Sequence, residues 1–595
     1  MQPTARKERE GALETLLGRA SLIGESIDLR PWRAFALLSA FYLLATIALS
    51  HFKLLWLDEL ITVHIAKLGS AGAIWQALSH GADPNPPLTH LLVMASYKVF
   101  GAHTYAFRLP AVAGYWVGML ALFLFAKRLT TPTWALVTVL MSMGMVGFEW
   151  SYESRSYALI YGTTMLAVHL WSVSTEPALS RAKKSAAVAG MALALATGLC
   201  CNYFSVLAFV PVAVGELVRT MQSVWWRRNS PPRAAVAQSV RWTVWLALAI
   251  ALAPLVMLRS LVERAIAMYL PYAWNRVSFD ATGAAYEDMV GAMLIPLGLL
   301  AVTWVVLCFF RKYGADERHR ATDMQQTDRI FLLSPVAAKG AAALCLVLYP
   351  YLGWALATLH GGMLSPRFVI PVCFGMAIAG GYLGFRALGT FRSSGPAFLL
   401  FFLFWFTGRE SWTGYGYSEQ RDGLYKLFDA LQTVDHAQEA IAVTDNLLVL
   451  PFQYYAPADV SRRVYYPMDV TATMNRRHEA SAEVNLWHGR DLYGFNIMPL
   501  AEFHRSQESY FLVTSEPDWL LDDLHAHDFP VKVVVPYTRS EPLTLMTTPI
   551  SHHPVTIFRV AGGLNRSVDA PGIPWIDPLP LTVPFDLQGE VPRDH

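Results

Sequence analysis

The sequence has few charged residues, few cysteines and almost no excess of either charge. Asp, Glu, Lys and Arg supply 15% of its 595 residues, well below the roughly 25% of an ordinary soluble domain. Its five cysteines all lie in apolar stretches, without a CxxC pattern or a Cys/His spacing suited to a metal. This pattern argues against a disulfide framework and a zinc site. The net charge of +2 gives no sign of an anionic partner.

Apolar residues are abundant instead. They make up 54% of the chain, and 19 Trp and 31 Phe are among them. A disordered, fibrous or nucleic-acid-binding chain could not keep so much apolar surface out of water. The composition therefore predicts a membrane protein.

The first 30 residues are polar and carry charges of both signs. A cleavable signal peptide has a different pattern. We therefore expect residues 1–30 to be a cytoplasmic segment, and the first apolar stretch to be an uncleaved anchor.

Long apolar segments predict about eleven transmembrane helices, because crossing about 30 Å of hydrocarbon takes about 20 helical residues. They lie near residues 31–51, 109–126, 133–150, 156–174, 185–201, 203–219, 241–258, 289–310, 331–358, 366–385 and 395–409.

The basic residues predict the orientation of these spans. With the N-terminus inside, the predicted cytoplasmic loops hold clusters such as Lys127-Arg128 and Arg181 with Lys183 and Lys184, as the positive-inside rule requires. The apolar segment 86–101 must then not cross, and its length and double proline suit a juxtamembrane or re-entrant helix. An odd number of spans places the C-terminal region outside, and we expect an integral protein of the cell inner membrane.

The C-terminal region has the composition of a soluble domain. Short β-rich runs such as AIAVTDNLLVLPFQYYA, SYFLVTS, VKVVVPY and VTIFRVA alternate with helix-like segments. This alternation predicts an extracytoplasmic α/β or α+β domain over residues 411–568. Residues 569–595 are Pro-rich and predict an extended tail. Residues 31–410 then form the membrane domain.

The first external loop offers a pair of candidate catalytic acids, Asp58 and Glu59. They lie in WLDELITVHIAK, where apolar residues recur at helical spacing, so we expect an amphipathic helix along the interface. Both acids fall in its first turn, where the helix dipole favours an ionised carboxylate. The alternative is that they only cap this helix.

Two further loop motifs carry polar residues at the same membrane face. HGADPNPPL places Asp83 and Asn85 in a rigid turn, and EWSYESRSYA places Glu153, Arg155 and Tyr157 between two spans. Ionisable groups at a membrane boundary are costly unless solvated or paired, so they mark a candidate site.

Four motifs in series resemble a known superfamily. WLDE, PNPPLTHLL followed by FRLPAVAG, ESRSYAL and SPRFVIPV look like the GT-C membrane glycosyltransferases. The likeness is to the protein O-mannosyltransferase-like group, which includes the lipid A aminoarabinose transferases. It spans roughly residues 31–410; the C-terminal region matches no family that we recognise.

The resemblance implies transfer of a sugar from a polyprenyl phosphate to an acceptor outside the cytoplasm, with an acid of the first loop as base. The acid of this family falls on Asp58, with Glu59 completing the pair, and its two arginines fall on Arg155 and Arg367. Where relatives often have Lys or His before the double proline, this chain has Asn85. Arg155, Arg367 or His360 would then have to supply that cationic contact.

The chemistry supports the same residues. A lipid phosphodiester is a good leaving group, so its displacement needs cations on the phosphate and one base for the acceptor hydroxyl. The acceptor hydroxyl belongs to a lipid, a glycan or a protein, and direct attack would invert the anomeric carbon. The candidate catalytic residues are Asp58 and Glu59, and the candidate substrate-binding residues are Asp83, Asn85, Glu153, Arg155, Tyr157, His360 and Arg367.

Simpler roles remain open for several of these residues. Arg155 could pair with Glu153, and Arg367 could anchor its span at the interface. Asp83 could form only a turn, Tyr157 could belong to the aromatic belt, and His360 stands alone in an exported turn.

A hydrolase and a metal site fit less well. Glycosidases need two carboxyl groups facing each other across the bond, whereas Asp58 and Glu59 point about 100° apart on a helix; Asp83 or Glu153 could complete such a pair. Asp58, Glu59 and Asp83 offer oxygen ligands for a divalent cation, but no DxD-type ligand set is present. We expect no cofactor and leave metal dependence open.

Two rival functions are a transporter or flippase for lipid-linked sugars and a non-catalytic scaffold. A transporter would need charged groups near the bilayer midplane and usually an internal repeat, and the sequence shows neither. Substitution of Asp58 by Asn separates these functions: a catalyst should lose nearly all turnover and keep its fold, whereas a transporter or scaffold should be almost unaffected.

Overall fold

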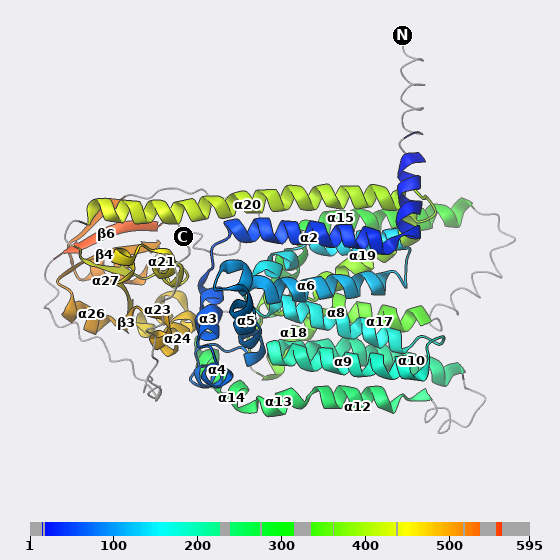
Figure 1. The fold of residues 1–595 in the computed structure, drawn as a ribbon, viewed down its shortest axis with the longest axis horizontal. Coiled ribbons are helices and arrows are strands. Elements are labelled where there is room, and N and C mark those ends of the chain that lie inside the picture. Colours follow the sequence, from blue (N-terminus) through cyan, green and yellow to red (C-terminus); the bar gives the residue numbers. More distant parts are fainter. Residues whose placement is uncertain are drawn as a thin grey trace, which may run out of the picture.

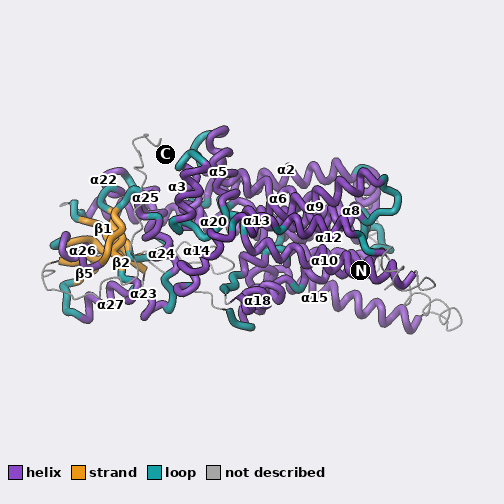
Figure 2. Tube along the Cα trace, turned by 90° about the horizontal axis from the view of Figure 1, so that it is seen from below, coloured by secondary structure: helices purple, strands orange, loops and turns teal. Residues whose placement is uncertain are grey.

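The protein has two parts, a long helical bundle and a smaller domain with a sheet at one end of it (Figures 1 and 2). The computed structural model describes residues 15, 18–226, 239–273, 277–314, 335–360, 362–435, 438–515, 518–535 and 555–561. The predicted tail at 569–595 lies outside the described residues, as does about half of the predicted N-terminal segment.

A helix is present at each of the eleven predicted spans. Among the described residues, four helices are long and apolar enough to cross a membrane, or up to eight if each bent pair is one span. The helices and 3₁₀ helices of the bundle are α2 (Pro31–Phe52), α6 (Thr104–Ala126), α7 (Pro132–Met143), η1 (Val146–Tyr152), α8 (Tyr157–Ser174), α9 (Arg181–Cys201), η2 (Tyr203–Ala208), α10 (Phe209–Trp226), α12 (Trp242–Ala251), α13 (Ala253–Met257), α14 (Arg259–Tyr269), η3 (Leu270–Tyr272), α15 (Asp280–Gly314), α17 (Pro335–Val347), α18 (Tyr349–His360), η4 (Pro366–Val369), α19 (Val372–Leu388) and α20 (Ser394–Val434).

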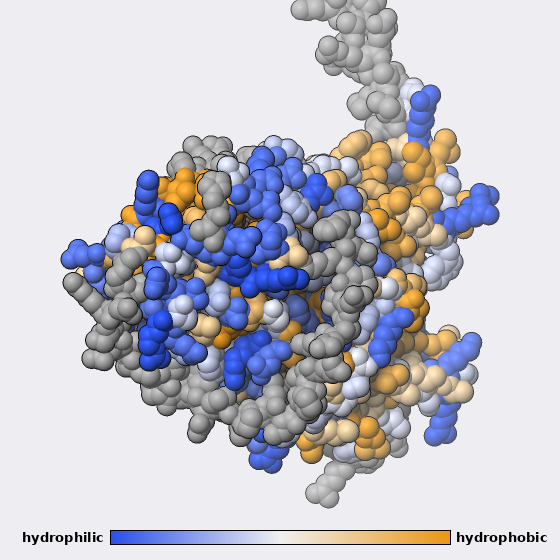
Figure 3. Space-filling model, turned by 60° about the vertical axis from the view of Figure 1, so that its left-hand side comes forward, coloured by the Kyte–Doolittle hydropathy of each residue, from blue (hydrophilic) through white to orange (hydrophobic). Residues whose placement is uncertain are grey.

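The surface of the two parts differs as the composition predicts. Hydrophobic residues gather over the helical bundle, whereas hydrophilic residues gather over the domain with the sheet (Figure 3). Large apolar side chains on the bundle, such as Leu37, Ile295 and Phe404, are well exposed. In a soluble protein such a surface would be unstable, and in a lipid bilayer it is the favourable one. The chain is therefore a polytopic helical membrane protein with an additional C-terminal domain.

Close helix contacts hold the end of the bundle that carries the loop motifs. A Cβ atom added at Gly162 on α8 would lie 2.1 Å from the carbonyl oxygen of Gly114 on α6. Only glycine permits this approach, as at many interfaces between transmembrane helices. The contact fixes the start of α8, and with it Tyr157, relative to α6.

Three helices of the first loop lie across that end of the bundle instead of along it (Figure 1). They are α3 (Leu57–Lys67), α4 (Ala71–Ser79) and α5 (Pro87–Phe100). α5 has only 14 residues and begins directly after Pro86, which is too short to cross a membrane. The prediction of juxtamembrane helices in the first loop is confirmed.

The C-terminal domain contains a mixed six-stranded sheet, with helices packed around it. Its strands are β1 (Ala440–Val443), β2 (Val464–Met468), β3 (Asn496–Pro499), β4 (Ser509–Ser515), β5 (Val531–Val535) and β6 (Val555–Ala561), in the order β3-β2-β1-β4-β6-β5. The first four are parallel, and β6 is antiparallel to both β4 and β5. The helices are α21 (Val449–Tyr455), α22 (Ala458–Ser461), α23 (Val470–Arg477), α24 (Ser481–His488), α25 (Arg490–Tyr493), α26 (Leu500–Ser506) and α27 (Trp519–Ala526).

The predicted β-rich runs contain β1, β4, β5 and β6. The run that begins at Ala440 is a strand for four residues only, and its second half forms α21. β2 and β3 were not predicted. Both are short and each contains a proline, which weakens the sequence signal of a strand.

Contacts of the C-terminal domain hold it over the loop end of the bundle. α20 runs for 41 residues without a break across the predicted domain boundary at residue 410. Near its end, the ring of Phe428 packs on that of Phe452, with 5.0 Å between the ring centres. The backbone N–H of Leu55 donates to the Tyr455 hydroxyl at 2.8 Å, and Asn485 Nδ2 donates to the carbonyl of Ala82 at 2.8 Å. These buried contacts tie the domain to the first loop.

Candidate active site

A cavity of about 2580 Å³ lies between the loop end of the bundle, the first loop and the C-terminal domain. It is larger than the 300–1,000 Å³ of an ordinary small-molecule pocket. Its lining combines apolar residues of α14, α15 and α20 with polar residues of the loops, among them Asp58, Asn85, Glu149, Arg155, Tyr157, Asn202 and Arg367. A cavity of this kind can take a long apolar chain together with a polar head group.

Asp58 projects from the first turn of α3 into this cavity. Its Oδ2 atom accepts a hydrogen bond from Arg367 Nη1 at 2.8 Å and lies 3.9 Å from Arg155 Nε. No side chain caps the start of α3, so Asp58 is not the helix cap that the sequence left open. With a side chain 17% exposed, the carboxylate is partly solvated and stays within reach of a ligand.

Arg367 joins the acid to two aromatic rings. It lies on η4, and its guanidinium carbon is 5.6 Å from the centre of the Tyr157 ring and 6.0 Å from that of Trp56. A guanidinium over aromatic faces is stabilised electrostatically, while its N–H groups stay free to donate hydrogen bonds in the plane of the guanidinium. Tyr157 is itself buried, so these rings form one wall of the site.

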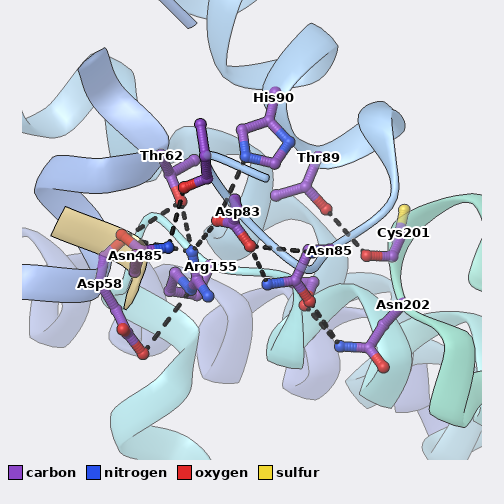
Figure 4. Close-up of polar contacts among 12 residues, drawn as sticks. Asp58, Thr62, Asp83, Asn85, Thr89, His90, Arg155, Cys201, Asn202 and Asn485 are labelled. Carbon is purple, nitrogen blue, oxygen red and sulfur yellow. Dashed lines mark hydrogen bonds and ion pairs between the residues drawn. The ribbon is translucent and has the colours of Figure 1, made fainter. Parts of the chain in front are cut away.

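Arg155 and Asp83 form a buried ion pair beside Asp58 (Figure 4). Arg155 Nη1 donates to Asp83 Oδ2 at 2.5 Å and to Thr62 Oγ1 at 2.9 Å. His90 Nε2 lies 3.4 Å from the same carboxylate oxygen. Burial alone would raise the pKa of Asp83, but Arg155 and His90 hold it well below its ordinary value. Asp83 is thus ionised and serves to position Arg155.

Asn85 lines the cavity and belongs to a chain of hydrogen bonds. Its backbone N–H and its Nδ2 both donate to Asp83 Oδ1, at 2.9 and 2.6 Å, and its Oδ1 accepts from Asn202 Nδ2 at 3.1 Å. Asn202 also donates to Ser156 Oγ at 3.0 Å. Asn85 is therefore a neutral, hydrogen-bonded link between the first loop and the start of α8.

Glu59, the neighbour of Asp58 on α3, does not line the cavity. It is completely buried and accepts two hydrogen bonds from Arg108, from Nε to Oε1 and from Nη2 to Oε2, both at 2.8 Å. The backbone N–H of Ser154 donates to the same carboxylate at 2.7 Å. The remaining donors of Arg108 go to the carbonyls of Ser50, Lys53 and Leu54. This network fixes the turn between α2 and α3 and so the position of Asp58.

Glu153 likewise does not line the cavity. Its Oε1 atom pairs with Lys53, and both side chains are buried. Burial raises the pKa of Glu153 to about 7, although the Lys53 ammonium acts in the other direction. The pairing of Arg155 with Glu153 that the sequence left open does not occur, because Arg155 pairs with Asp83 instead.

Several residues of the site were not predicted from the sequence. They are Lys53, Thr62, His90, Arg108, Asn202 and Asn485. Arg108 could have been noticed, since it is the one charge in the apolar motif FRLPAVAG, and such a charge needs a partner. The side chain of His360, which was predicted, lies outside the described part of the chain.

The three carboxylates considered for a divalent cation do not converge. Asp58 faces Arg367, Glu59 faces Arg108 and Asp83 faces Arg155. Among the described residues, no group of three or more metal-ligating side chains was found. Within the ranges that the structure describes, the positively charged side chains that line the cavity are all arginines.

Comparison with solved structures finds a similar fold in two structures of ArnT. The structure of ArnT from Cupriavidus metallidurans bound to undecaprenyl phosphate matches with a TM-score of 0.51 and 11% identity, over 88% of this chain and 97% of that chain. ArnT in the apo state matches with a TM-score of 0.52 and 11% identity, over 88% and 98% of the two chains. No family model and no curated protein matches the sequence. This chain therefore shares the fold of ArnT over most of both chains, and the predicted polytopic helical fold with an additional C-terminal domain is confirmed.

Proposed function

We propose that this chain is an integral membrane glycosyltransferase that transfers a sugar from a polyprenyl phosphate to a hydroxyl group on the exported side of the inner membrane. The observation that carries the proposal is the contact between Asp58 and Arg367 in the wall of the cavity. It places a carboxylate that can accept a proton beside a cation that can bind a phosphate. Both belong to motifs shared with the GT-C superfamily.

Asp58 acts as the base in this proposal. The acceptor oxygen attacks the anomeric carbon as its proton passes to the carboxylate, and the bond from that carbon to the phosphate oxygen breaks. Polyprenyl phosphate leaves with one additional negative charge, and the configuration at the anomeric carbon inverts. Since Asp83 and Glu153 do not line the cavity, neither supplies the second carboxylate that a glycosidase would need.

Arg367 and Arg155 stabilise the leaving phosphate. A guanidinium has five N–H groups, so Arg367 can hold Asp58 and still bind phosphate oxygens through its other donors. Arg155 is fixed by Asp83 and Thr62 and points its Nε side toward Asp58. Fixed donors of this kind stabilise developing charge without the cost of reorganisation.

The donor class is inferred from the fold and from the cavity. The related ArnT structure contains undecaprenyl phosphate, and the cavity of this chain has apolar residues such as Leu294, Ile295 and Phe404 beside the polar site. These three side chains are also well exposed on the bundle surface. A lipid chain can therefore leave the cavity through this wall while its phosphate stays at the arginines.

Radiolabelled transfer in membranes tests the proposal. Membranes with the wild-type chain or the Asp58→Asn variant receive a panel of polyprenyl-phosphate sugars, and label is followed into lipid, glycan and protein fractions. Label that appears only with the wild type supports the transferase and defines the acceptor class. Equal transfer by the variant, or no transfer from any donor, would instead favour the transporter or scaffold.

A further inference from the structure

The parallel part of the C-terminal sheet has a point where the direction of winding reverses. From β1 the chain proceeds outward through β2 to β3, whereas β4 lies on the other side of β1. Loops that leave the carboxyl ends of two such neighbouring strands go in opposite directions and leave a crevice between them, where α/β domains bind ligands. In this domain the crevice lies between the residues that follow β1 and the end of β4.

Polar residues occupy this crevice and are held in fixed positions. Asp445 follows β1, and its Oδ2 atom accepts a hydrogen bond from Ser515 Oγ, at the end of β4, at 2.6 Å. The next residue, Asn446, donates from Nδ2 to Glu483 Oε1 at 3.3 Å. Asp445, Asn446 and Ser515 are all buried in the protein, yet all three line the cavity.

A cation completes the crevice. Arg477, at the end of α23, also lines the cavity, and no described residue forms a hydrogen bond or a close ion pair with it. Burial alone would lower the pKa of Arg477, but the nearby Tyr466, Glu483 and Asp445 outweigh this effect, so that the pKa is raised. We call Asp445, Asn446, Ser515 and Arg477 the switch-point subsite.

The subsite is continuous with the catalytic wall. Ser481 and Ala482 of α24 line the cavity next to it, and Asn485 follows one helical turn later on the same side of that helix. Asn485 donates to the carbonyl of Ala82, directly before Asp83 (Figure 4). One short helix therefore connects the crevice to the residues around Asp58.

The charges of the subsite indicate the chemistry of its ligand. The carboxylate of Asp445 would repel a free phosphate group, and Arg477 would repel a cationic ligand. A lipid chain would bury the guanidinium of Arg477 without a hydrogen bond, which is costly. A sugar ring has neutral hydroxyl groups that donate to carboxylate and amide oxygens and accept from a guanidinium.

We propose that the switch-point subsite binds a carbohydrate portion of the acceptor and so directs an acceptor hydroxyl toward Asp58. The proposal rests on the proposed function, because an acceptor exists only if the chain is a transferase. It gives the C-terminal domain a role in acceptor selection. The donor phosphate stays at Arg155 and Arg367.

The test compares full-length Asp445→Asn and Arg477→Gln variants with the wild type. The asparagine keeps an oxygen for the backbone N–H groups of Leu447 and Leu448 that Asp445 Oδ1 now accepts, so the fold is preserved. Asp459→Asn is the matched control, since Asp459 lies exposed on the same domain and does not line the cavity. Three readouts are taken: transfer rate against a dilution series of membrane acceptor extract, binding of undecaprenyl phosphate, and binding of a panel of neutral oligosaccharides.

We expect both subsite variants to need about 10-fold more acceptor extract for half-maximal rate. This change corresponds to the loss of roughly one good polar contact. Maximal rate and undecaprenyl phosphate binding should stay within about two-fold of wild type. Unchanged acceptor saturation in both variants, or a loss of undecaprenyl phosphate binding, would overturn the assignment. If the wild type transfers no sugar but binds an oligosaccharide in a manner sensitive to Asp445→Asn, the proposed function fails and a carbohydrate site stands. If it neither transfers nor binds, both proposals fail.

Discussion

Arg367 and Asp58 are 309 residues apart in the sequence, yet Nη1 of the arginine donates to Oδ2 of the aspartate at 2.8 Å. The contact joins the first turn of a loop helix to a 3₁₀ helix that precedes a late span. Two residues that were predicted from separate motifs thus form one ion pair at the cavity wall. Their contact also orients the carboxylate, which does not cap its helix.

Replacement of Asp58 by Asn is expected to lower the transfer rate at least about 10³-fold, because the amide cannot take the acceptor proton. Fold and undecaprenyl phosphate binding should be retained. The measurement is single-turnover transfer from a polyprenyl-phosphate sugar, with thermal unfolding alongside. Glu263→Gln is the control, since Glu263 also lines the cavity but is exposed and pairs with the neighbouring Arg259. A similar loss in both variants would count against a specific role of Asp58.

Replacement of Arg367 by Gln is expected to weaken undecaprenyl phosphate binding by about 10- to 100-fold, through the loss of a charged, two-oxygen contact. Arg367→Lys should recover part of the affinity, because it restores the charge without the planar fork. Binding to protein in nanodiscs measures both. Arg259→Gln removes a cavity-lining but exposed arginine and should have little effect. Unaltered phosphate binding by Arg367→Gln would show that the arginine only anchors its helix.

Glu59 should respond differently from its neighbour Asp58. Glu59→Gln leaves the buried guanidinium of Arg108 without its counter-charge, so we expect the protein to lose about 3–5 kcal/mol of stability, as when one partner of a buried pair is removed. Thermal unfolding of the purified protein measures this loss. Combining the change with Arg108→Met should restore part of the stability. A stable, fully folded Glu59→Gln protein that has lost only activity would instead support a catalytic role for Glu59.

The ion pair between Asp83 and Arg155 should give the stability a defined pH dependence. Because the pKa of Asp83 is held below its ordinary value of about 4 in the folded protein, its ionised form stabilises the fold above that pH. This contribution is lost as the pH falls through the folded pKa. Asp83→Asn should therefore be less stable than the wild type at pH 7, and the difference should shrink below about pH 4. Thermal unfolding across this range checks it, and an equal difference at pH 7 and pH 3 would contradict the ion pair.

Transfer should continue in the presence of EDTA. The three carboxylates at the site face three different arginines, and these cations can neutralise the leaving phosphate without a metal. The measurement is the transfer rate of purified protein before and after chelation, with Mg²⁺ added back. A rate that falls on chelation and returns with Mg²⁺ would show that a divalent cation takes part.

Local patterns were enough to predict much of the fold. Apolar runs of sufficient length gave the positions of the helices, and helical spacing around Asp58 predicted α3. The runs at 509–515 and 555–561 coincide with β4 and β6, because alternating β-branched and aromatic residues form strands wherever a sheet is available. β2 and β3 are short and each ends at or near a proline, so they are strands only where the neighbouring strands supply their hydrogen bonds.

The sequence by itself determined that this is a helical membrane protein and that its candidate acids and arginines lie in a few loop motifs, which resemble those of the GT-C glycosyltransferases. It did not determine which acid faces the cavity. Asp58 and Glu59 are neighbours of similar chemistry; Glu59 pairs with Arg108, 49 residues away, and Asp58 lines the cavity. Such pairings, and the position of the C-terminal domain over the cavity, depend on contacts between distant segments, which only the packing of the whole chain brings together.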